Sequence, residues 1–217
     1  MERYAVIGLG KFGATVVRSL HERGHEVVAI DRDRPRVQDV RDSCTQAIEA
    51  NCTDQDTLRA LGIHDADAVV VSLGEQMDAS ILVTLYLKEL GIRKIVVKAV
   101  SEDHGKILHL IGATEIVHPE RDTARRVARG LAVRSIVEYL PLAADSSLVE
   151  LQVPAEFVGK TLAELEIRKR YQVLVVAIKR GDDLLIATGG DERLQGADVL
   201  VLVGKDADLD RVGRLAG

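Results

Sequence analysis

The segment Gly8-Leu9-Gly10-Lys11-Phe12-Gly13 constrains the fold more than any other part of this sequence. It follows a short apolar run, Tyr4–Gly8, that predicts a buried strand, and it opens a helix-length segment, Phe12–Arg23. In this spacing the first glycine makes a tight turn, the second lets the backbone approach a phosphate, and the third lets the helix pack closely on the strand. Free N–H groups and the dipole at the helix start then favour an anion. The segment therefore predicts a nucleotide- or dinucleotide-binding site.

Strand-like and helix-like segments alternate through the first half of the chain. Further strand-like runs are Glu26–Asp31, Gln46–Asn51, Ala68–Leu73, Lys94–Val100 and Glu115–His118. The helix-length segments between them are Arg34–Ser43, Asp54–Leu61, Met77–Leu90 and Asp103–Ile111. Glycines that fit left-handed helix stops follow four of the helical runs, at Gly24, Gly62, Gly91 and Gly112. Short connections between alternating elements predict parallel strands, and hence an α/β fold with a Rossmann-like doubly wound parallel sheet.

The order of elements changes after Pro119. Apolar residues at a 3.6-residue spacing predict one helix over Asp122–Ile136, and Tyr139–Ser147, which contains a proline, is interpreted as a linker. The tail then predicts the strand Leu148–Val153, the helix Leu162–Ile167, the strands Val173–Arg180, Leu184–Thr188 and Val199–Val203, and the helix Ala207–Leu215. Arg180-Gly181-Asp182-Asp183 is a hairpin signal. We therefore expect two domains, residues 1–138 with the nucleotide site and residues 139–217 forming a small α+β domain that a partner copy completes.

Composition excludes several classes of protein. The net charge is −5 and only 3% of residues are aromatic, which argues against a dedicated nucleic-acid binder. The longest stretch without a charged residue, Ala79–Leu87, is too short to span a membrane. Met1-Glu2-Arg3 leads directly into a strand, so we expect no signal peptide and an intracellular protein. Cys44 and Cys52 do not make a disulfide framework, and we interpret them as partly buried fillers rather than a redox pair or metal site.

Polar residues at the carboxyl ends of the strands supply the candidate ligands of a nucleotide. Asp31 ends the second strand, where a carboxylate accepts hydrogen bonds from ribose hydroxyls and repels a 2′-phosphate. Asn51 and Lys98 lie at the same edge, Lys11 lies inside the glycine-rich loop, and Glu120 is a candidate ligand of a divalent cation beside phosphates. The rest of the predicted cofactor-binding set is Phe12, Arg32, Cys52, Ser72 and Leu73. From these residues alone, NAD(H) cannot be separated from ATP, ADP or AMP.

The helix over Met77–Leu90 has almost no polar face, so we expect a second subunit to cover it, the alternative being burial within one chain. The region after His118 contains no His and no Cys, and no recognisable catalytic set. A nucleotide domain joined to such a region suits a regulator better than an enzyme.

Several segments resemble the potassium-transport regulatory subunits of the KtrA/TrkA type. These are Tyr4–Gly13, Gly24-His25-Glu26-Val27, Leu87-Lys88-Glu89-Leu90, Gly112-Ala113, His118-Pro119-Glu120-Arg121-Asp122 and Ala197-Asp198-Val199-Leu200-Val201. The resemblance covers nearly the whole chain. It implies an N-terminal RCK (KTN) domain over residues 1–138, crossover helix included, and a C-terminal RCK_C (TrkA-C) domain over residues 139–217.

The resemblance also implies a mode of action. Such proteins form dimers that assemble into a cytosolic octameric ring beneath a membrane potassium-translocating subunit of the KtrB/TrkH type. ATP and ADP bind the N-domains, and the shape of the ring differs between the two states. By position, Gly8, Gly10 and Gly13 would hold phosphates and Asp31 the ribose, with Asn51 near the adenine.

Three further residues carry a role only by this resemblance. Lys11 stands where the family usually has an Arg that touches the neighbour's γ-phosphate. Glu120 matches the carboxylate that holds Mg²⁺ or Ca²⁺. Arg168 matches an Arg that binds cyclic di-AMP in some relatives, although their proline-containing segment is replaced here by Ala187-Thr188-Gly189-Gly190.

We therefore expect a cytoplasmic, nucleotide-gated regulator of potassium uptake without chemistry of its own, peripheral to the membrane through its transporter. The alternatives are an NAD-dependent oxidoreductase and an NAD(H)-sensing regulator of another cation transporter.

Overall fold

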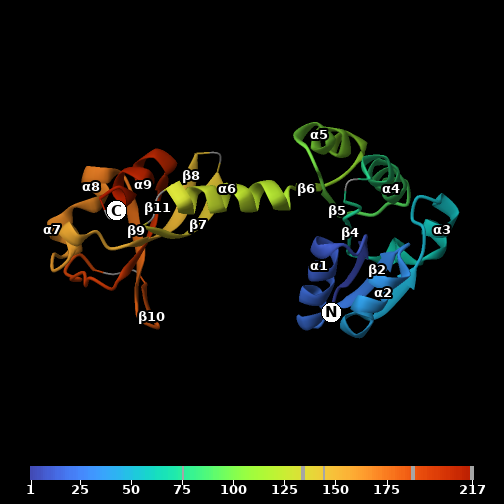
Figure 1. Cartoon of the computed structure of the whole chain (residues 1–217), viewed down its shortest axis with the longest axis horizontal. Coiled ribbons are helices and arrows are strands. Elements are labelled where there is room, and N and C mark those ends of the chain that lie inside the picture. Colours follow the sequence, from blue (N-terminus) through green and yellow to red (C-terminus); the bar gives the residue numbers. More distant parts are fainter. Residues whose placement is uncertain (75, 133–134, 144, 187–188, 216–217) are drawn as a thin grey trace. The chain divides into compact units, whose positions relative to one another are not determined.

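The computed structural model describes residues 1–74, 76–132, 135–143, 145–186 and 189–215 (Figure 1). Contacts between residues divide the chain into two compact units, Met1–Glu120 and Arg121–Gly217. These contacts place most of the helix after Pro119 with the second unit, and the predicted division into domains after residue 138 stays a prediction. Among the described residues, no helix is both long enough and apolar enough to cross a membrane.

The first unit is a parallel six-stranded sheet with helices on both faces (Figure 1). Its strands are β1 (Arg3–Ile7), β2 (Glu26–Asp31), β3 (Gln46–Glu49), β4 (Ala68–Val71), β5 (Ile95–Lys98) and β6 (Glu115–Val117). Its helices are α1 (Lys11–Glu22), α2 (Arg34–Val40), α3 (Gln55–Ala60), α4 (Met77–Glu89) and α5 (Glu102–Ile111). The strand order is β3-β2-β1-β4-β5-β6, with every pair parallel. This order confirms the predicted doubly wound sheet.

Two apolar layers hold this sheet because successive side chains of each strand point to opposite faces. Val6 and Ala29 pack on one face with Val17 of α1 and Val40 of α2. On the other face, Ala5, Ile7 and Ile30 pack with Leu58 of α3, Val83 of α4 and Leu108 of α5. The abundance of Val and Ile in the sequence is therefore explained by strands that are buried on both sides.

The structure of the first unit agrees closely with the elements predicted from the sequence. Each predicted strand and helix is present, with ends that differ by three residues at most. The predicted helix stops Gly24, Gly62, Gly91 and Gly112 all have positive φ angles, between 63° and 122°. Each of them therefore occupies backbone space that residues with a Cβ adopt at a cost.

The second unit contains an antiparallel five-stranded sheet in the order β10-β9-β11-β8-β7. After α6 (Pro119–Ala132), its elements are β7 (Ile136–Ala143), β8 (Ser146–Gln152), α7 (Leu162–Leu165), α8 (Ile167–Tyr171), β9 (Leu174–Arg180), β10 (Asp183–Ile186), β11 (Val199–Lys205) and α9 (Asp206–Gly213). Leu151 and Leu200 of the sheet pack with Ile167 of α8 and Leu209 of α9 in one core. The predicted hairpin is confirmed, because Arg180 pairs with Asp183 across the two residues of the turn.

Three predictions for this half of the chain are wrong. The predicted helix Leu162–Ile167 is two short helices, α7 and α8, which meet at Glu166, where the φ angle is +46°. Tyr139–Ser147 is not a linker, because β7 pairs with β8 along most of its length. Pro141 is tolerated there because β7 is the last strand of the sheet and a proline on an edge strand removes no ladder bond from the interior. The helix over Asp122–Ile136 begins earlier and ends at Ala132, and Ile136 starts β7 with a buried side chain. Residues 133–134 of that predicted helix, and 187–188 of the predicted strand Leu184–Thr188, lie outside the described residues.

Candidate functional site

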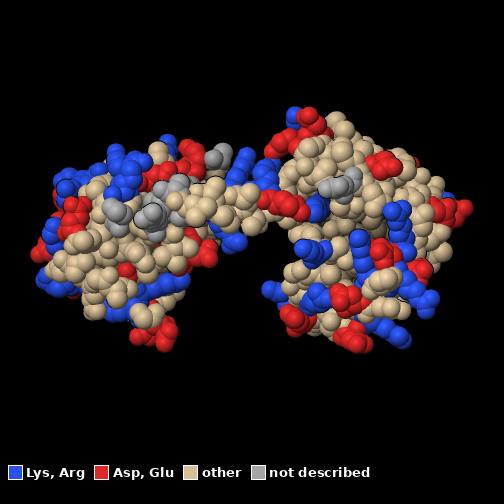
Figure 2. All heavy atoms as spheres, viewed as in Figure 1, with Lys and Arg blue, Asp and Glu red and all other residues tan. Residues whose placement is uncertain are grey.

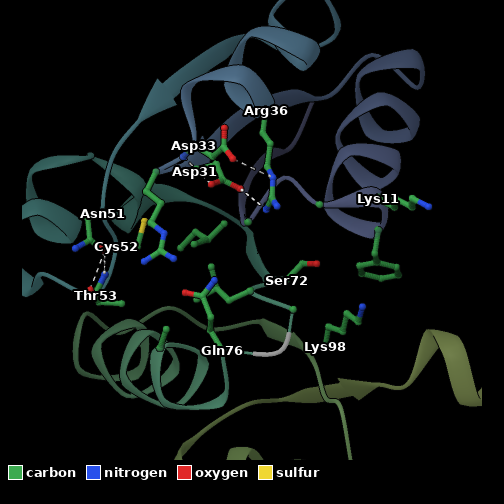
Figure 3. Close-up of a pocket in the computed structure, with 18 of the residues that line it drawn as sticks. Lys11, Asp31, Asp33, Arg36, Asn51, Cys52, Thr53, Ser72, Gln76 and Lys98 are labelled. Atoms are coloured by element: carbon green, nitrogen blue, oxygen red, sulfur yellow. Dashed lines mark hydrogen bonds and ion pairs between the residues drawn. The ribbon is translucent and has the colours of Figure 1, made fainter.

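A cavity of about 610 Å³ opens at the carboxyl edge of the parallel sheet (Figure 3). Of the predicted cofactor-binding residues it is lined by Gly8, Gly10, Lys11, Phe12, Asp31, Arg32, Asn51, Cys52, Ser72, Leu73, Lys98 and Glu120. Residues distant in sequence meet here because parallel strands present their carboxyl ends at one edge. Gly13 is absent from the lining, and its role is in packing.

The glycine-rich loop joins β1 to α1, and at two of its glycines there is no space for a Cβ. Gly8 has a φ of +93°, and a Cβ there would overlap the carbonyl oxygen of Ser72. A Cβ on Gly13 would overlap the carbonyl oxygen of Gly8, whereas one on Gly10 would meet nothing within 4 Å. Gly10 therefore leaves its side of the loop open to a ligand.

The start of α1 suits an anion. Gly10 occupies the N-cap, so no side chain caps the helix, and the first turn contains no acidic residue. The N–H groups of a helix start and its dipole favour negative charge. These features support the predicted position of phosphates.

Asp31 shapes the loop as well as facing the cavity. Its side chain is 7% exposed, its Oδ2 accepts a hydrogen bond from the N–H of Leu9 at 2.7 Å, and its Oδ1 accepts one from the N–H of Asp33 at 2.9 Å. A carboxylate has about four acceptor positions. Two remain for hydroxyl groups such as those of a ribose.

Sequence reasoning missed the charged residues beside Asp31. Arg36 lines the cavity from α2, with Nη1 3.7 Å from Oδ2 of Asp31 and Nε 3.5 Å from a carboxylate oxygen of Asp33 (Figure 3). The spacing of three residues between Asp33 and Arg36 at the start of a predicted helix was the available signal. Other cavity residues not predicted are Ile7, Ala50, Thr53, Gly74, Gln76 and Ala79.

The far end of the cavity is formed after β3. Oδ1 of Asn51 accepts hydrogen bonds from both the N–H and the hydroxyl of Thr53, at 3.2 and 2.8 Å. The amide nitrogen of Asn51 is thereby the group of that side chain best placed to donate to a ligand. Burial, with a smaller contribution from the charge of Asp31, raises the pKa of Cys52 to about 12. The Cys52 thiol therefore stays protonated and acts as an apolar wall.

Lys98 and Glu120 form an ion pair beside the loop, with Nζ and Oε1 2.5 Å apart. The Lys98 side chain is 13% exposed and that of Glu120 is 71% exposed. The hydrogen bond from Lys98 is the main reason that the pKa of Glu120 is lowered. Among the described residues, no group of three or more His, Cys, Asp or Glu could hold a metal ion. A divalent cation would therefore depend on ligand phosphates and would compete with Lys98 for Glu120.

Two further predicted residues have exposed side chains. The Lys11 side chain is exposed and extends away from Asp31 and Asn51 (Figure 3). Arg168 belongs to the second unit, where it is exposed on α8 with Lys169 and Arg170, and basic side chains gather over that helix (Figure 2).

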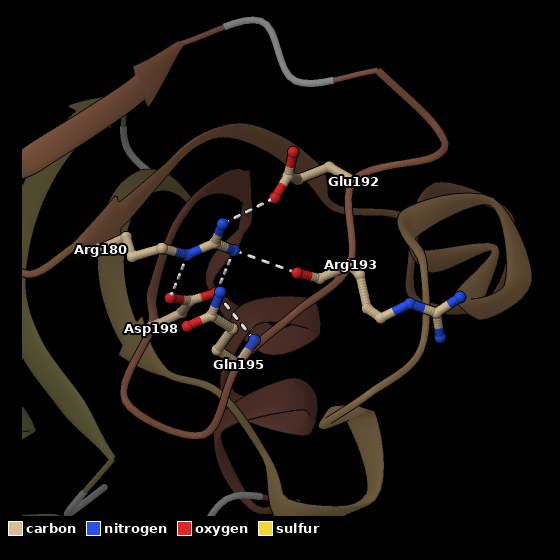
Figure 4. A network of polar contacts seen from close by, with 5 residues as sticks. All are labelled: Arg180, Glu192, Arg193, Gln195 and Asp198. Carbon is tan, nitrogen blue, oxygen red and sulfur yellow. Dashed lines mark hydrogen bonds and ion pairs between the residues drawn. The ribbon is translucent and has the colours of Figure 1, made fainter.

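The loop from Gly189 to Asp198, between β10 and β11, is clamped to β9 (Figure 4). Arg180 donates two hydrogen bonds to the buried carboxylate of Asp198, at 2.9 and 2.8 Å, and a third to the carbonyl oxygen of Arg193. Its third nitrogen lies 3.0 Å from Glu192. The N–H of Ala163 in α7 donates a hydrogen bond to the carbonyl oxygen of Gly190 at 2.7 Å, so the same loop is also tied to α7.

Two family models match the chain. The TrkA-N domain matches residues 4–119 and the TrkA-C domain matches residues 147–217. The chain is 40% identical to the Ktr system potassium uptake protein C of Bacillus subtilis over 97% of its length and 95% of that protein. It is 36% identical to the Ktr system potassium uptake protein A of the same organism, with the same coverage. Identity to the protein A of Vibrio alginolyticus is 37%, over 94% of this chain and 92% of that protein.

Solved structures share the fold at lower identity. The GsuK RCK domain superposes with a TM-score of 0.67 and 22% identity over the whole of this chain, which spans 48% of that chain. The GsuK channel gives a TM-score of 0.69 and 22% identity, and this chain spans 39% of it. The predicted resemblance and the predicted fold class are both confirmed.

Proposed function

Because the chain belongs to the family of Ktr-type potassium uptake proteins that combine a TrkA-N with a TrkA-C domain, we propose that it is a nucleotide-binding regulatory subunit of a potassium uptake system. One observation carries the nucleotide part of the proposal: the cavity brings the glycine-rich loop, the start of α1 and the Asp31 carboxylate to one edge of the sheet. The loop and helix start suit phosphates, and Asp31 suits a ribose.

The proposed ligands are ATP and ADP, bound with phosphates at Gly8 and Gly10, ribose at Asp31 and adenine towards Asn51. The basic side chain of Lys98 also lines the cavity, and a longer phosphate chain would extend towards it. Mg²⁺ or Ca²⁺ would bind between those phosphates and Glu120. NAD(H) is the second candidate, because the same loop and carboxylate serve a dinucleotide, and one solved GsuK channel is described as bound to NAD and another as bound to ADP.

The proposed mechanism is a population shift rather than catalysis. A ligand moves an equilibrium between two conformations only by the difference in its affinity for them. We propose that the chain acts in the cytoplasm as a homodimer within an octameric ring, against a membrane potassium-translocating subunit. Lys11 would then reach the nucleotide of a neighbouring copy, in keeping with an exposed side chain that extends away from Asp31 and Asn51. Cyclic di-AMP at Arg168 is a separate proposal that rests on the basic surface of α8.

A calorimetric titration of the full-length protein tests the proposal. ATP, ADP, AMP, NAD, NADH and cyclic di-AMP are each titrated, with and without Mg²⁺ or Ca²⁺. Binding of ATP or ADP that is lost in Gly10→Val, which fills the open side of the loop, is the expected result. Unchanged binding in that variant would remove the loop from the site, and no binding of any adenine nucleotide by the natural protein would refute the proposal.

A second assay separates a regulator from an oxidoreductase. Absorbance at 340 nm is followed with NADH and a panel of small carbonyl compounds. Turnover of NADH would favour the enzyme. Nucleotide-dependent potassium uptake in vesicles that contain the transporter partner would favour the regulator.

A further inference from the structure

We propose that Arg36 is the residue that sets how the nucleotide site treats the 2′ position of the ribose. The sequence predicts that Asp31 repels a 2′-phosphate because like charges meet. The structure adds a cation at the same place, since a guanidinium nitrogen of Arg36 lies 3.7 Å from Oδ2 of Asp31. This inference rests on the proposed function, because it concerns the same cavity.

The surroundings of Asp31 leave the Arg36 side chain well placed for this role. Each oxygen of the carboxylate already accepts a main-chain N–H, from Leu9 and from Asp33, so Asp31 is fixed in position. Arg36 holds no comparably short hydrogen bond to it, and its side chain is 53% exposed on the cavity. A fixed carboxylate and an adjustable guanidinium together present a ribose with one acceptor and one donor.

The balance of charge then decides what the site accepts. Asp31 and Asp33 contribute two negative charges, and Arg36 lies within 4 Å of both. Without Arg36, an added phosphate on the ribose would face two carboxylates with weaker compensation. With Arg36, a planar fork of donors that matches a phosphate faces the same group. The natural protein should therefore discriminate against a 2′-phosphate less strongly than Asp31 alone would dictate.

The test compares two ligands that differ only by a 2′-phosphate, 5′-AMP and adenosine 2′,5′-bisphosphate, by calorimetric titration at low ionic strength. NAD and NADP give a second pair that differs by the same group. In Arg36→Gln, the ratio of Kd for the phosphorylated ligand to Kd for its partner is expected to rise about 5- to 10-fold, since one nearby, partly exposed positive charge is lost. Arg36→Lys, which keeps the charge, is expected to restore most of the natural ratio.

Arg18→Gln is the matched control, because Arg18 forms an exposed ion pair with Asp39, 2.6 Å away, and does not line the cavity. Its ratio should stay within about twofold of the natural one. An unchanged ratio in a folded Arg36→Gln that still binds 5′-AMP would overturn the inference alone. A larger change of the Kd ratio in Arg32→Gln than in Arg36→Gln would also overturn the inference, because it would assign the role to the other arginine of the cavity. Failure of the natural protein to bind any adenine nucleotide, ATP and ADP included, would instead overturn the proposed function together with this inference.

Discussion

Two glycines of one loop meet different physical demands. Gly13 is required by packing, since a Cβ there would overlap the carbonyl oxygen of Gly8 within the β1–α1 unit. A Cβ on Gly10 would meet nothing within 4 Å, so a side chain there would obstruct only a bound ligand. A substitution at Gly13 should therefore lower stability, whereas a substitution at Gly10 should weaken ligand binding.

Gly13→Ala is expected to lower the free energy of unfolding by about 1–3 kcal/mol, the usual cost of forcing an extra methyl group into a packed interior. Gly10→Ala should cost about 1 kcal/mol or less, because it changes only the N-cap residue of α1, yet it should weaken nucleotide binding. Urea unfolding and calorimetric titration of both variants check this. Equal loss of stability in the two variants would contradict the assignment of separate roles.

The fold controls the protonation state of His104. Its side chain is fully buried, Nδ1 accepts a hydrogen bond from the N–H of Val100, and Nε2 has no partner among the described residues. Burial, followed by the neighbouring charge of His118, lowers the pKa of His104 from 6.5. A protonated His104 would lose the bond from Val100 and leave a charge in the interior.

The pH dependence follows from that direction. The folded-state pKa lies below the unfolded value, so the unfolded chain binds the proton more readily. The contribution of neutral His104 to the free energy of unfolding is therefore fully present above about pH 6.5, and it is lost as the pH falls through the folded-state pKa. Chemical unfolding of the natural protein and of His104→Asn, compared between pH 5 and 7.5, should show a flatter curve in the variant. Parallel curves would mean that groups other than His104 carry the dependence.

At the scale of elements, periodicity predicted the first unit well and the second less well. The strands β1 to β6 are short segments, most of them apolar, and each one could be predicted from its own residues. β7 could not, because its outer residues Val137, Leu140 and Leu142 are more than half exposed and Pro141 interrupts the pattern. Its place depends on pairing with β8, which no local signal encodes.

The candidate site shows the same division. Residues at strand ends, such as Asp31 and Lys98, were predictable because the topology brings them to one edge. Arg36 was harder to predict, because its spacing of three residues from Asp33 does not show that α2 also brings it beside Asp31. The clamp of Arg180 on Asp198 likewise joins residues whose meeting depends on the order of the antiparallel strands.

Asp198 should hold the loop between β10 and β11 through its charge. The hydrogen bonds from Arg180 lower the pKa of this buried carboxyl, so its stabilising effect is present above its ordinary pKa of 3.8 and is lost as the pH falls further. Asp198→Ala is expected to lower the free energy of unfolding by about 1–3 kcal/mol, as for a lost hydrogen bond to a charged group. Asp198→Asn should cost less, because it keeps the shape. Urea unfolding at pH 7 and pH 3.5 checks both variants, and equal stability of Asp198→Ala and the natural protein at pH 7 would contradict the clamp.

At the scale of the whole molecule, the chain is two units that each have their own core, with the proposed ligand site within the first. A regulator of this kind needs surfaces through which a ligand-dependent change can reach other chains. The helix α4 supplies a candidate, as the sequence predicted. Val83 and Leu87 are buried against the sheet, yet Met77, Leu82 and Leu85 remain 37–39% exposed. The monomer therefore covers only part of this apolar helix, and its cover by a second copy stays a prediction.

The paired substitution Leu82→Lys and Leu85→Lys tests that prediction. Two lysines on an exposed face should leave the fold intact, because surface substitutions usually change stability by about 0.5 kcal/mol or less, but they should disrupt an interface that depends on apolar contact. Light scattering after size exclusion is expected to give a smaller assembly for the variant than for the natural protein. Glu22→Lys, an exposed charge change on α1, serves as the control and should keep the natural mass. A variant that keeps its natural mass, or a natural protein that is a strict monomer, would show that α4 does not join copies of this chain.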